Sequence, residues 1–163
     1  MEKDKDYSRL SEIISDLKRK STAEVSEAFE LRNLPFTITF ARMECFGGAR
    51  YFIRHVNPDG TVGGFVEKTA LATETTYVSP TALVLGKSNV TGYAKILDYA
   101  IVDGKAWVSE YAELHNFARA TGNSWIMNHA SLKDNAMISG NVWIRNDSVI
   151  SGNTILSGDE KIG

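Results

Sequence analysis

Small and aliphatic residues alternate with polar ones in a repeat of six residues over the second half of the chain. From Ala82 onward, thirteen units follow without insertion, each reading small, any, aliphatic, any, then mostly glycine, asparagine or aspartate, and any residue. Small and aliphatic residues two positions apart lie on one side of an extended chain and form a buried stripe. Glycine, asparagine and aspartate tolerate a left-handed backbone and so allow a sharp bend. The pattern predicts a β-solenoid, because the 3.6-residue spacing of an amphipathic helix is absent here.

A longer period of eighteen residues lies inside the six-residue repeat. Glycine recurs at this spacing at Gly86, Gly104, Gly122, Gly140 and Gly158, whereas the two other corner series are mixed. Aromatic series share the period: Trp107, Trp125 and Trp143; Tyr93, Tyr111 and His129; Tyr99 and Phe117. Three units per coil explain both observations, since one edge of a three-sided prism then stacks glycine on glycine. We expect a mainly β, three-sided solenoid of roughly five coils, with a tryptophan ladder of about 4.8 Å rungs on one face.

The first sixty residues carry a different pattern. Apolar residues fall on one stripe of an amphipathic helix, and Ser21 with Glu24 has the spacing of a capping box for a second helix. The expected elements are helices over residues 7–19 and 21–32, strands over residues 36–41 and 50–56, and a turn over residues 57–60. We interpret residues 1–60 as an α+β N-terminal cap that covers the first coil of a solenoid formed by residues 61–163. A partner-binding or oligomerising head is the alternative.

Composition and charge exclude several classes of protein function. The 163 residues are 43% hydrophobic and 23% charged, as is typical of one globular domain with a small appendage. The net charge of −2 provides no basic field for nucleic acid or an anionic membrane. Cys45 is the single cysteine, which excludes a disulfide framework and a multi-cysteine zinc site. The charged N-terminus is no signal peptide and no segment could span a bilayer, so we expect a soluble cytoplasmic protein with neither metal nor cofactor.

Several segments resemble a known family. The units Ala94-Lys95-Ile96 and Ala106-Trp107-Val108-Ser109 have the form A-x-V-x-G-x, and Gly63-Gly64-Phe65-Val66-Glu67 is similar to a Gly-Gly-Phe-Ile-Glu stretch that often precedes such repeats. They resemble the hexapeptide-repeat left-handed β-helix family, in the branch found in enterobacterial proteins assigned as transferases and in phage proteins. The resemblance covers residues 50–162 and implies a left-handed parallel β-helix. It also implies a bacterial or phage-encoded protein, which in the second case would act in the host cytoplasm.

The resemblance implies one enzymatic alternative, a hexapeptide acyltransferase. Such enzymes use a histidine as general base and acyl-CoA as the donor, in a groove between the subunits of a trimer. His115, which lies beside Glu113, and His129 are the candidate bases, since a neutral imidazole suits proton abstraction near pH 7. These enzymes usually extrude a loop from the repeat and end in a helix, and the sequence predicts neither feature. We therefore expect no catalysis, and acyl-CoA enters only with this alternative.

The tryptophan ladder is the best candidate for a binding surface. Trp107, Trp125 and Trp143 each precede an inward-facing aliphatic residue, so alternation directs them outward, and Met127 and Arg145 share their face. Three uses are open: subunit packing in a homotrimer, burial under the N-terminal helix, and a platform for another protein or a sugar ring. The function that we expect is a non-catalytic binding or scaffolding solenoid. It recognises a protein partner, such as a host protein that it blocks, through its flat faces or cap.

Overall fold

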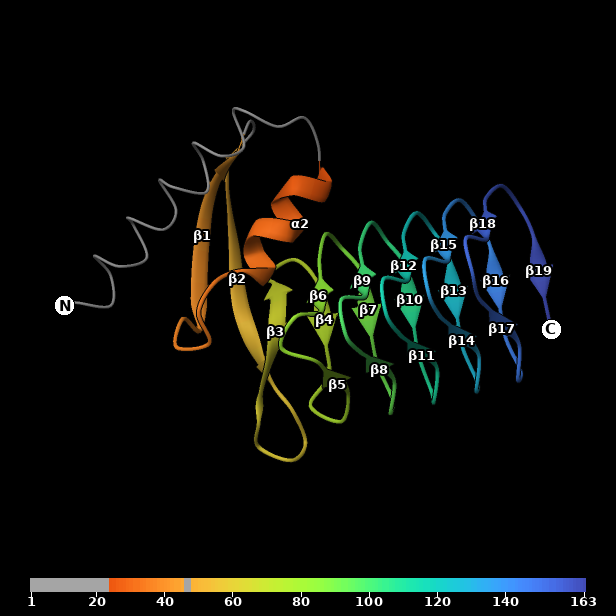
Figure 1. Cartoon of the computed structure of the whole chain (residues 1–163), viewed down its shortest axis with the longest axis horizontal. Coiled ribbons are helices and arrows are strands. Elements are labelled where there is room, and N and C mark those ends of the chain that lie inside the picture. The colour runs from red at the N-terminus through yellow and green to blue at the C-terminus, as the bar shows by residue number, and fades with distance from the viewer. Residues whose placement is uncertain (1–23, 46–47) are drawn as a thin grey trace.

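The computed structural model describes residues 24–45 and 48–163, which form one helix and three sheets (Figure 1). The helix is α2 (Glu24–Arg32), in agreement with the second expected helix. The expected helix over residues 7–19, the capping residue Ser21 and the tip of the hairpin at residues 46–47 lie outside the described residues.

Three longer strands precede a series of very short ones. The longer strands are β1 (Phe40–Cys45), β2 (Gly48–Val56) and β3 (Val62–Glu67). The two-residue strands are β4 (Leu71–Ala72), β5 (Tyr77–Val78), β6 (Leu83–Val84), β7 (Asn89–Val90), β8 (Lys95–Ile96), β9 (Ile101–Val102), β10 (Trp107–Val108), β11 (Glu113–Leu114), β12 (Arg119–Ala120), β13 (Trp125–Ile126), β14 (Ser131–Leu132), β15 (Met137–Ile138), β16 (Trp143–Ile144), β17 (Val149–Ile150), β18 (Ile155–Leu156) and β19 (Lys161–Ile162).

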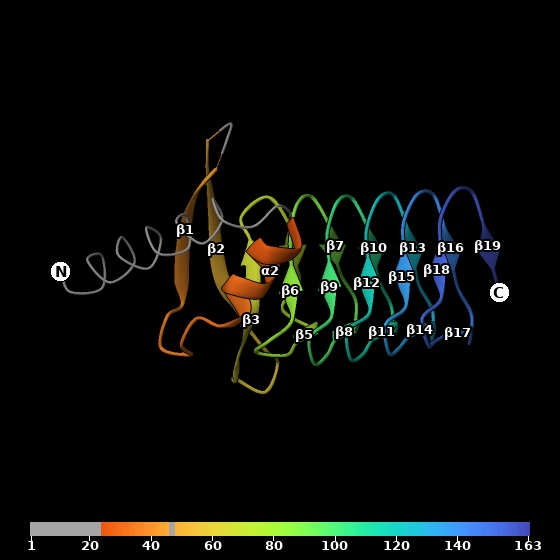
Figure 2. The same cartoon turned by 45° about the horizontal axis from the view of Figure 1, so that its top comes forward.

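The short strands stack into the three flat faces of a solenoid (Figures 1 and 2). Face A contains β6, β9, β12, β15 and β18, face B contains β4, β7, β10, β13, β16 and β19, and face C contains β5, β8, β11, β14 and β17. Within each face, neighbouring strands are parallel and their paired residues are eighteen apart, as in Glu113 with Ser131. The expected fold class is confirmed: a three-sided, left-handed parallel β-helix of about five turns.

The interior of the solenoid is filled by the small and aliphatic columns. Ala112 and Leu114, which represent the two columns in one unit, are both fully buried. Corner residues have a left-handed backbone, with φ of 56° at Asn116 and 61° at Asn128. Their side chains also link successive coils, since the Asp134 amide donates to Asn116 Oδ1 over 3.1 Å and the Asn146 amide to Asn128 Oδ1 over 3.0 Å. Asparagine therefore compensates at these corners for the strain of its backbone.

The solenoid begins one coil before the uninterrupted repeat that starts at Ala82. β3 pairs in parallel with β6, β4 with β7 and β5 with β8, so the first coil precedes Ala82. Its corner residues are Lys68, Glu74 and Pro80, and none of these has a left-handed backbone. The threonine after each corner donates its hydroxyl to a carbonyl of the second coil: Thr69 to Gly86, Thr75 to Gly92 and Thr81 to Asp98. This coil therefore lacks the glycine and asparagine corners that mark the later coils.

The cap continues face A and packs on its outer side. β2 pairs antiparallel with both β1 and β3, which extends the sheet of face A beyond the first coil. The cluster between cap and face A contains Ala28, Leu31, Leu34, Ile38, Ala41, Met43, Phe52, Phe65, Leu83, Leu85 and Ile101. The prediction of a strand over residues 36–41 is wrong in its bounds, because Pro35 begins a turn in which the Ile38 amide donates to the Pro35 carbonyl over 3.0 Å. The strand starts at Phe40 instead.

Asn57 closes the free edge of face C. Its side-chain amide donates to the Val78 carbonyl over 3.1 Å, and its Oδ1 accepts from the Val78 amide over 2.8 Å. This pair of hydrogen bonds imitates a neighbouring strand, so β5 has its backbone groups satisfied at that position. The same bonds fix the turn of residues 57–60 beside the first coil.

Candidate functional site

The tryptophan ladder lies on the outer side of face B. Trp107 pairs with Trp125 in the sheet, and Trp125 pairs with Trp143. The ring centroids are 5.0 and 5.4 Å apart and the interplanar angles are 23° and 18°, so the three indoles stack. Each ring is half-buried, because the rings cover one another. The geometry produces a continuous aromatic strip that crosses three coils.

Polar and charged groups border the ladder. The Trp107 indole N–H donates to Thr91 Oγ1 over 3.2 Å, and the Lys161 ammonium lies 5.5 Å from the centre of the Trp143 ring. Met127 and Arg145 are half-buried on the same face, and Arg145 Nε donates to the Gly163 carbonyl over 3.2 Å. Helix α2 packs against face A, so this helix does not cover the ladder (Figure 2).

Face C carries the histidine that the acyltransferase alternative favours. His115 Nε2 lies 2.8 Å from Glu113 Oε2, and Glu113 Oε1 lies 3.6 Å from the Lys95 ammonium. A carboxylate that bonds one ring nitrogen fixes the tautomer of the imidazole and orients the other nitrogen. The Glu113–His115 pair is therefore capable of general-base chemistry, provided that a substrate can bind beside it.

The other histidines have different surroundings. His129 is exposed and stacks on Tyr111, with ring centroids 5.0 Å apart and an interplanar angle of 6°. The structure therefore places His129 in an aromatic stack, apart from the Glu113–His115 pair. His55 is buried, with Nε2 2.8 Å from the Thr76 carbonyl, and it joins the cap to the first coil.

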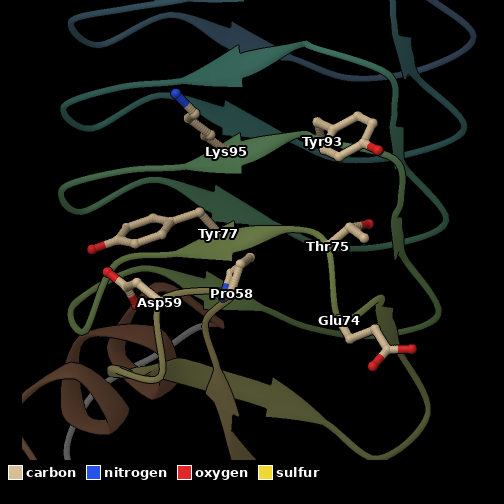
Figure 3. A pocket seen from close by; sticks show the side chains of 7 residues that line it. All are labelled: Pro58, Asp59, Glu74, Thr75, Tyr77, Tyr93 and Lys95. Atoms are coloured by element: carbon tan, nitrogen blue, oxygen red, sulfur yellow. The ribbon is translucent and has the colours of Figure 1, made fainter.

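A groove opens where the cap meets face C (Figure 3). Its volume is about 550 Å³, which is in the range of ligand-binding pockets. The lining residues come from the turn after β2 and from the first two coils: Pro58, Asp59, Glu74, Thr75, Tyr77, Tyr93 and Lys95. His115 does not line this groove, although Lys95, which does, contacts its partner Glu113.

The sequence patterns did not predict the groove. Its lining residues are separated by up to 37 positions, from Pro58 to Lys95, and they meet only because Asn57 holds the turn against Val78. The one available signal was Thr75, which breaks the eighteen-residue aromatic series just before Tyr93.

The charge of the groove is set by two carboxylates and one ammonium. Asp59 Oδ1 accepts from the Thr61 hydroxyl over 2.6 Å and from the Thr61 amide over 3.0 Å. These hydrogen bonds lower the pKa of Asp59, and the bond from the Thr61 hydroxyl has the larger effect. The carboxyl is therefore ionised at neutral pH. Glu74 is exposed at the other side of the groove (Figure 3).

In residues 24–45 and 48–163, histidine, cysteine, aspartate and glutamate nowhere form a group of three that could hold a metal ion. The same residues contain no helix with the length and apolarity that crossing a membrane requires. Comparisons of the chain with protein-family models, with curated proteins and with solved structures found no match.

Proposed function

We propose that the protein is a non-catalytic binding or scaffolding solenoid that recognises a protein surface through face B. The observation that carries this proposal is the stacked ladder of Trp107, Trp125 and Trp143, with Met127 and Arg145 beside it. Tryptophan, methionine and arginine are the residue types enriched in the buried centres of protein interfaces.

The rigidity of face B also favours binding. The ladder residues belong to strands that are paired on both sides, and each indole is held by its stacked neighbour. A side chain that is already ordered loses little conformational entropy when a partner covers it. The proposed partner surface is a second copy of this chain, and the proposed assembly is a homotrimer in which face B is shared between subunits.

Met127→Glu is expected to dissociate the assembly, because it places a charge in the centre of face B without removing a rung of the ladder. Removing a carboxylate from water at an interface costs several kcal/mol, and Arg145 in the next coil of face B offsets only part of this cost, so the dissociation constant should rise by at least about 10-fold. Native mass spectrometry and analytical ultracentrifugation measure this change. Trp125→Ala should weaken the assembly similarly, as truncation of an interface hot spot does.

The matched control for this test is Met137→Glu, which changes an exposed methionine of the same solenoid on face A. We expect this variant to keep the wild-type assembly. If Met127→Glu and Trp125→Ala retain the wild-type mass and dissociation constant, face B has no role in assembly and the proposal fails.

The acyltransferase alternative is supported by the Glu113–His115 hydrogen bond alone. On our proposal, the wild-type protein neither binds CoA in calorimetry nor releases free CoA from acetyl-CoA above the background rate. The alternative requires turnover that falls by about 10²–10⁴-fold in His115→Ala, the range for loss of a general base. His129→Ala, which changes a histidine in an aromatic stack, is the control that should keep that turnover.

A further inference from the structure

In two aromatic stacks of the solenoid, a lysine or arginine of the same chain lies over the terminal ring. The stack of Tyr99 on Phe117 has the Arg32 guanidinium 5.8 Å from the centre of the Tyr99 ring. Arg32 also donates to the Tyr99 carbonyl over 2.6 Å, which fixes it at this place. At the other end of the solenoid, the Lys161 ammonium lies 5.5 Å from the centre of the Trp143 ring, the last of the ladder. A cation over an aromatic face is attracted by the negative charge of that face.

The third stack has no such cation. Tyr93, Tyr111 and His129 stack with centroid distances of 5.4 and 5.0 Å. One coil before Tyr93 stands Thr75, whose short side chain donates to the Gly92 carbonyl and does not continue the stack. Tyr93 is 58% exposed, and no lysine or arginine of residues 24–45 and 48–163 lies over its ring. The first ring of this stack therefore presents an uncovered face to the groove.

The groove in front of Tyr93 has an excess of negative charge. Asp59 and Glu74 are both exposed at its rim. Lys95 is the single cation of the lining, and its ammonium lies 3.6 Å from Glu113, a carboxylate outside the groove. Figure 3 shows this ammonium pointing away from Asp59 and Tyr77. The positive charge of Lys95 is therefore paired with Glu113, outside the groove. The two groove carboxylates are thus available to a cationic ligand.

We propose that this groove binds an arginine side chain of a protein partner. The guanidinium would stack on the free face of Tyr93, as that of Arg32 lies over Tyr99, and its N–H groups would donate to Glu74, on the same side of the groove, while Asp59 on the opposite side adds to the attraction for the cation (Figure 3). A guanidinium fits better than an ammonium because it is planar, stacks on aromatic rings and pairs with carboxylates through a fork of donors.

The size of the groove favours an arginine within a polypeptide over a small molecule. A volume of about 550 Å³ is larger than one side chain, so residues flanking the arginine also fit. The groove is open along face C, and Pro58 and Tyr77 give it apolar walls for the stem of the side chain and the neighbouring backbone. This site lies on another face than the tryptophan ladder and does not depend on the function proposed for face B.

The test is an NMR titration of the ¹⁵N-labelled full chain with the blocked tripeptide acetyl-Gly-Arg-Gly-amide. We expect saturable shifts of the amides of Asp59, Thr75 and Tyr93. The matched peptide with citrulline in place of arginine has the same shape without the charge, and it should bind about ten-fold more weakly or not at all. Equal binding of the two peptides, or no saturable shift at these amides, would overturn the proposal.

Protein variants test the residues of the site. Tyr93→Leu and the double variant Asp59→Asn with Glu74→Gln should each raise the Kd of the arginine peptide by about ten-fold. The double variant changes only exposed side chains, so it tests the site even if Tyr93→Leu disturbs the fold. Tyr99→Leu, which alters the stack that Arg32 already covers, is the control that should keep wild-type binding. Unchanged binding in the double variant contradicts the proposed carboxylate contacts.

Two further measurements distinguish a polypeptide ligand from a small molecule, and the groove proposal from the face B proposal. Free L-arginine should bind more weakly than the peptide, and tighter binding of the free amino acid would assign the groove to a small molecule and overturn the polypeptide source. Met127→Glu, which tests face B, should leave peptide binding unchanged. A failure of the face B proposal and a failure of the groove proposal are therefore observed in different variants.

Discussion

Arg54→Met is expected to lower the free energy of unfolding of the cap by about 3–5 kcal/mol, as loss of a buried, fully bonded charged group does. Arg54 is 5% exposed and donates only to backbone carbonyls. Its acceptors are Ile38 at 2.7 Å, Leu34 at 2.9 Å, Pro80 at 3.1 Å, Pro35 at 3.2 Å and Gly63 at 3.3 Å. One side chain thus joins the turn before β1, strand β3 and the first coil.

The size of this effect follows from what methionine leaves behind. Methionine keeps the apolar stem but removes the donors, so buried carbonyls of three segments lose their partner. It also removes the cation from the Phe65 ring, whose centre lies 4.2 Å from the guanidinium carbon. Burial lowers the pKa of Arg54 from its ordinary value, as expected for a cation that is separated from water. The protein tolerates this burial because the carbonyl oxygens replace the lost hydration.

Native-state hydrogen exchange at the amides of β2 and β3 measures this loss, since these strands unfold with the cap. Arg54→Lys should fall between the wild type and Arg54→Met, because an ammonium keeps the charge but cannot reach five acceptors. Arg42→Met, which changes an exposed arginine of β1 that contacts Tyr51 at the surface, is the control and should alter exchange far less than Arg54→Met. Wild-type exchange in Arg54→Met would mean that the five hydrogen bonds do not hold the cap to the solenoid.

The solenoid could be predicted from sequence because each column of the repeat has one steric requirement. Ala112 can only be small and Leu114 only aliphatic at the centre of a narrow prism, so a simple spacing rule identifies both. The outward direction of Trp125 followed from the same alternation, and the structure places it there. The contacts that the ladder makes could not be predicted in the same way, because alternation gives the direction of a side chain and not its partner.

The cap and the groove were less predictable for a physical reason. Their geometry depends on single hydrogen bonds between distant segments, such as those of Asn57 to Val78, and a local pattern carries no sign of them. Arg54 illustrates the limit: a charged residue in an alternating strand is ordinarily exposed, whereas here it is buried against five carbonyls. The first coil lies before the uninterrupted repeat because threonine hydroxyls, instead of left-handed corners, connect it to the second.

Gly122→Ala is expected to lower the free energy of unfolding of the solenoid by about 2–4 kcal/mol, from backbone strain and from a clash with the next coil. Gly122 has φ of +67°, and a Cβ built there would lie 2.6 Å from the Gly140 amide nitrogen. The same is true one coil further on, where a Cβ at Gly140 would lie 2.6 Å from the nitrogen of Gly158. At the edge between faces A and B, a Cβ on these glycines would therefore meet the backbone of the next coil unless the two coils move apart.

The chain offers a matched control in which only the strain remains. Gly152 has φ of +68°, but a Cβ at that position would meet no atom within 4 Å. Gly152→Ala should therefore cost only about 1 kcal/mol, the penalty of a left-handed backbone for alanine. A second control, Asn128→Ala, lies in the middle of the solenoid at a corner that already holds a Cβ. It should cost about 1–2 kcal/mol, because the Asn146 amide loses its acceptor.

Gly122→Asn extends the comparison to the compensation seen at the other corners. Asparagine adopts a left-handed backbone more readily than alanine, and its Oδ1 would be placed to accept from the Gly140 amide, as Asn116 Oδ1 accepts from Asp134. We therefore expect Gly122→Asn to lose about half as much stability as Gly122→Ala. Urea denaturation gives the total loss, and hydrogen exchange should show it concentrated in the coils around Gly122, since each coil contacts only its neighbours. A Gly122→Ala variant no less stable than Gly152→Ala would contradict the close approach of coils at this edge.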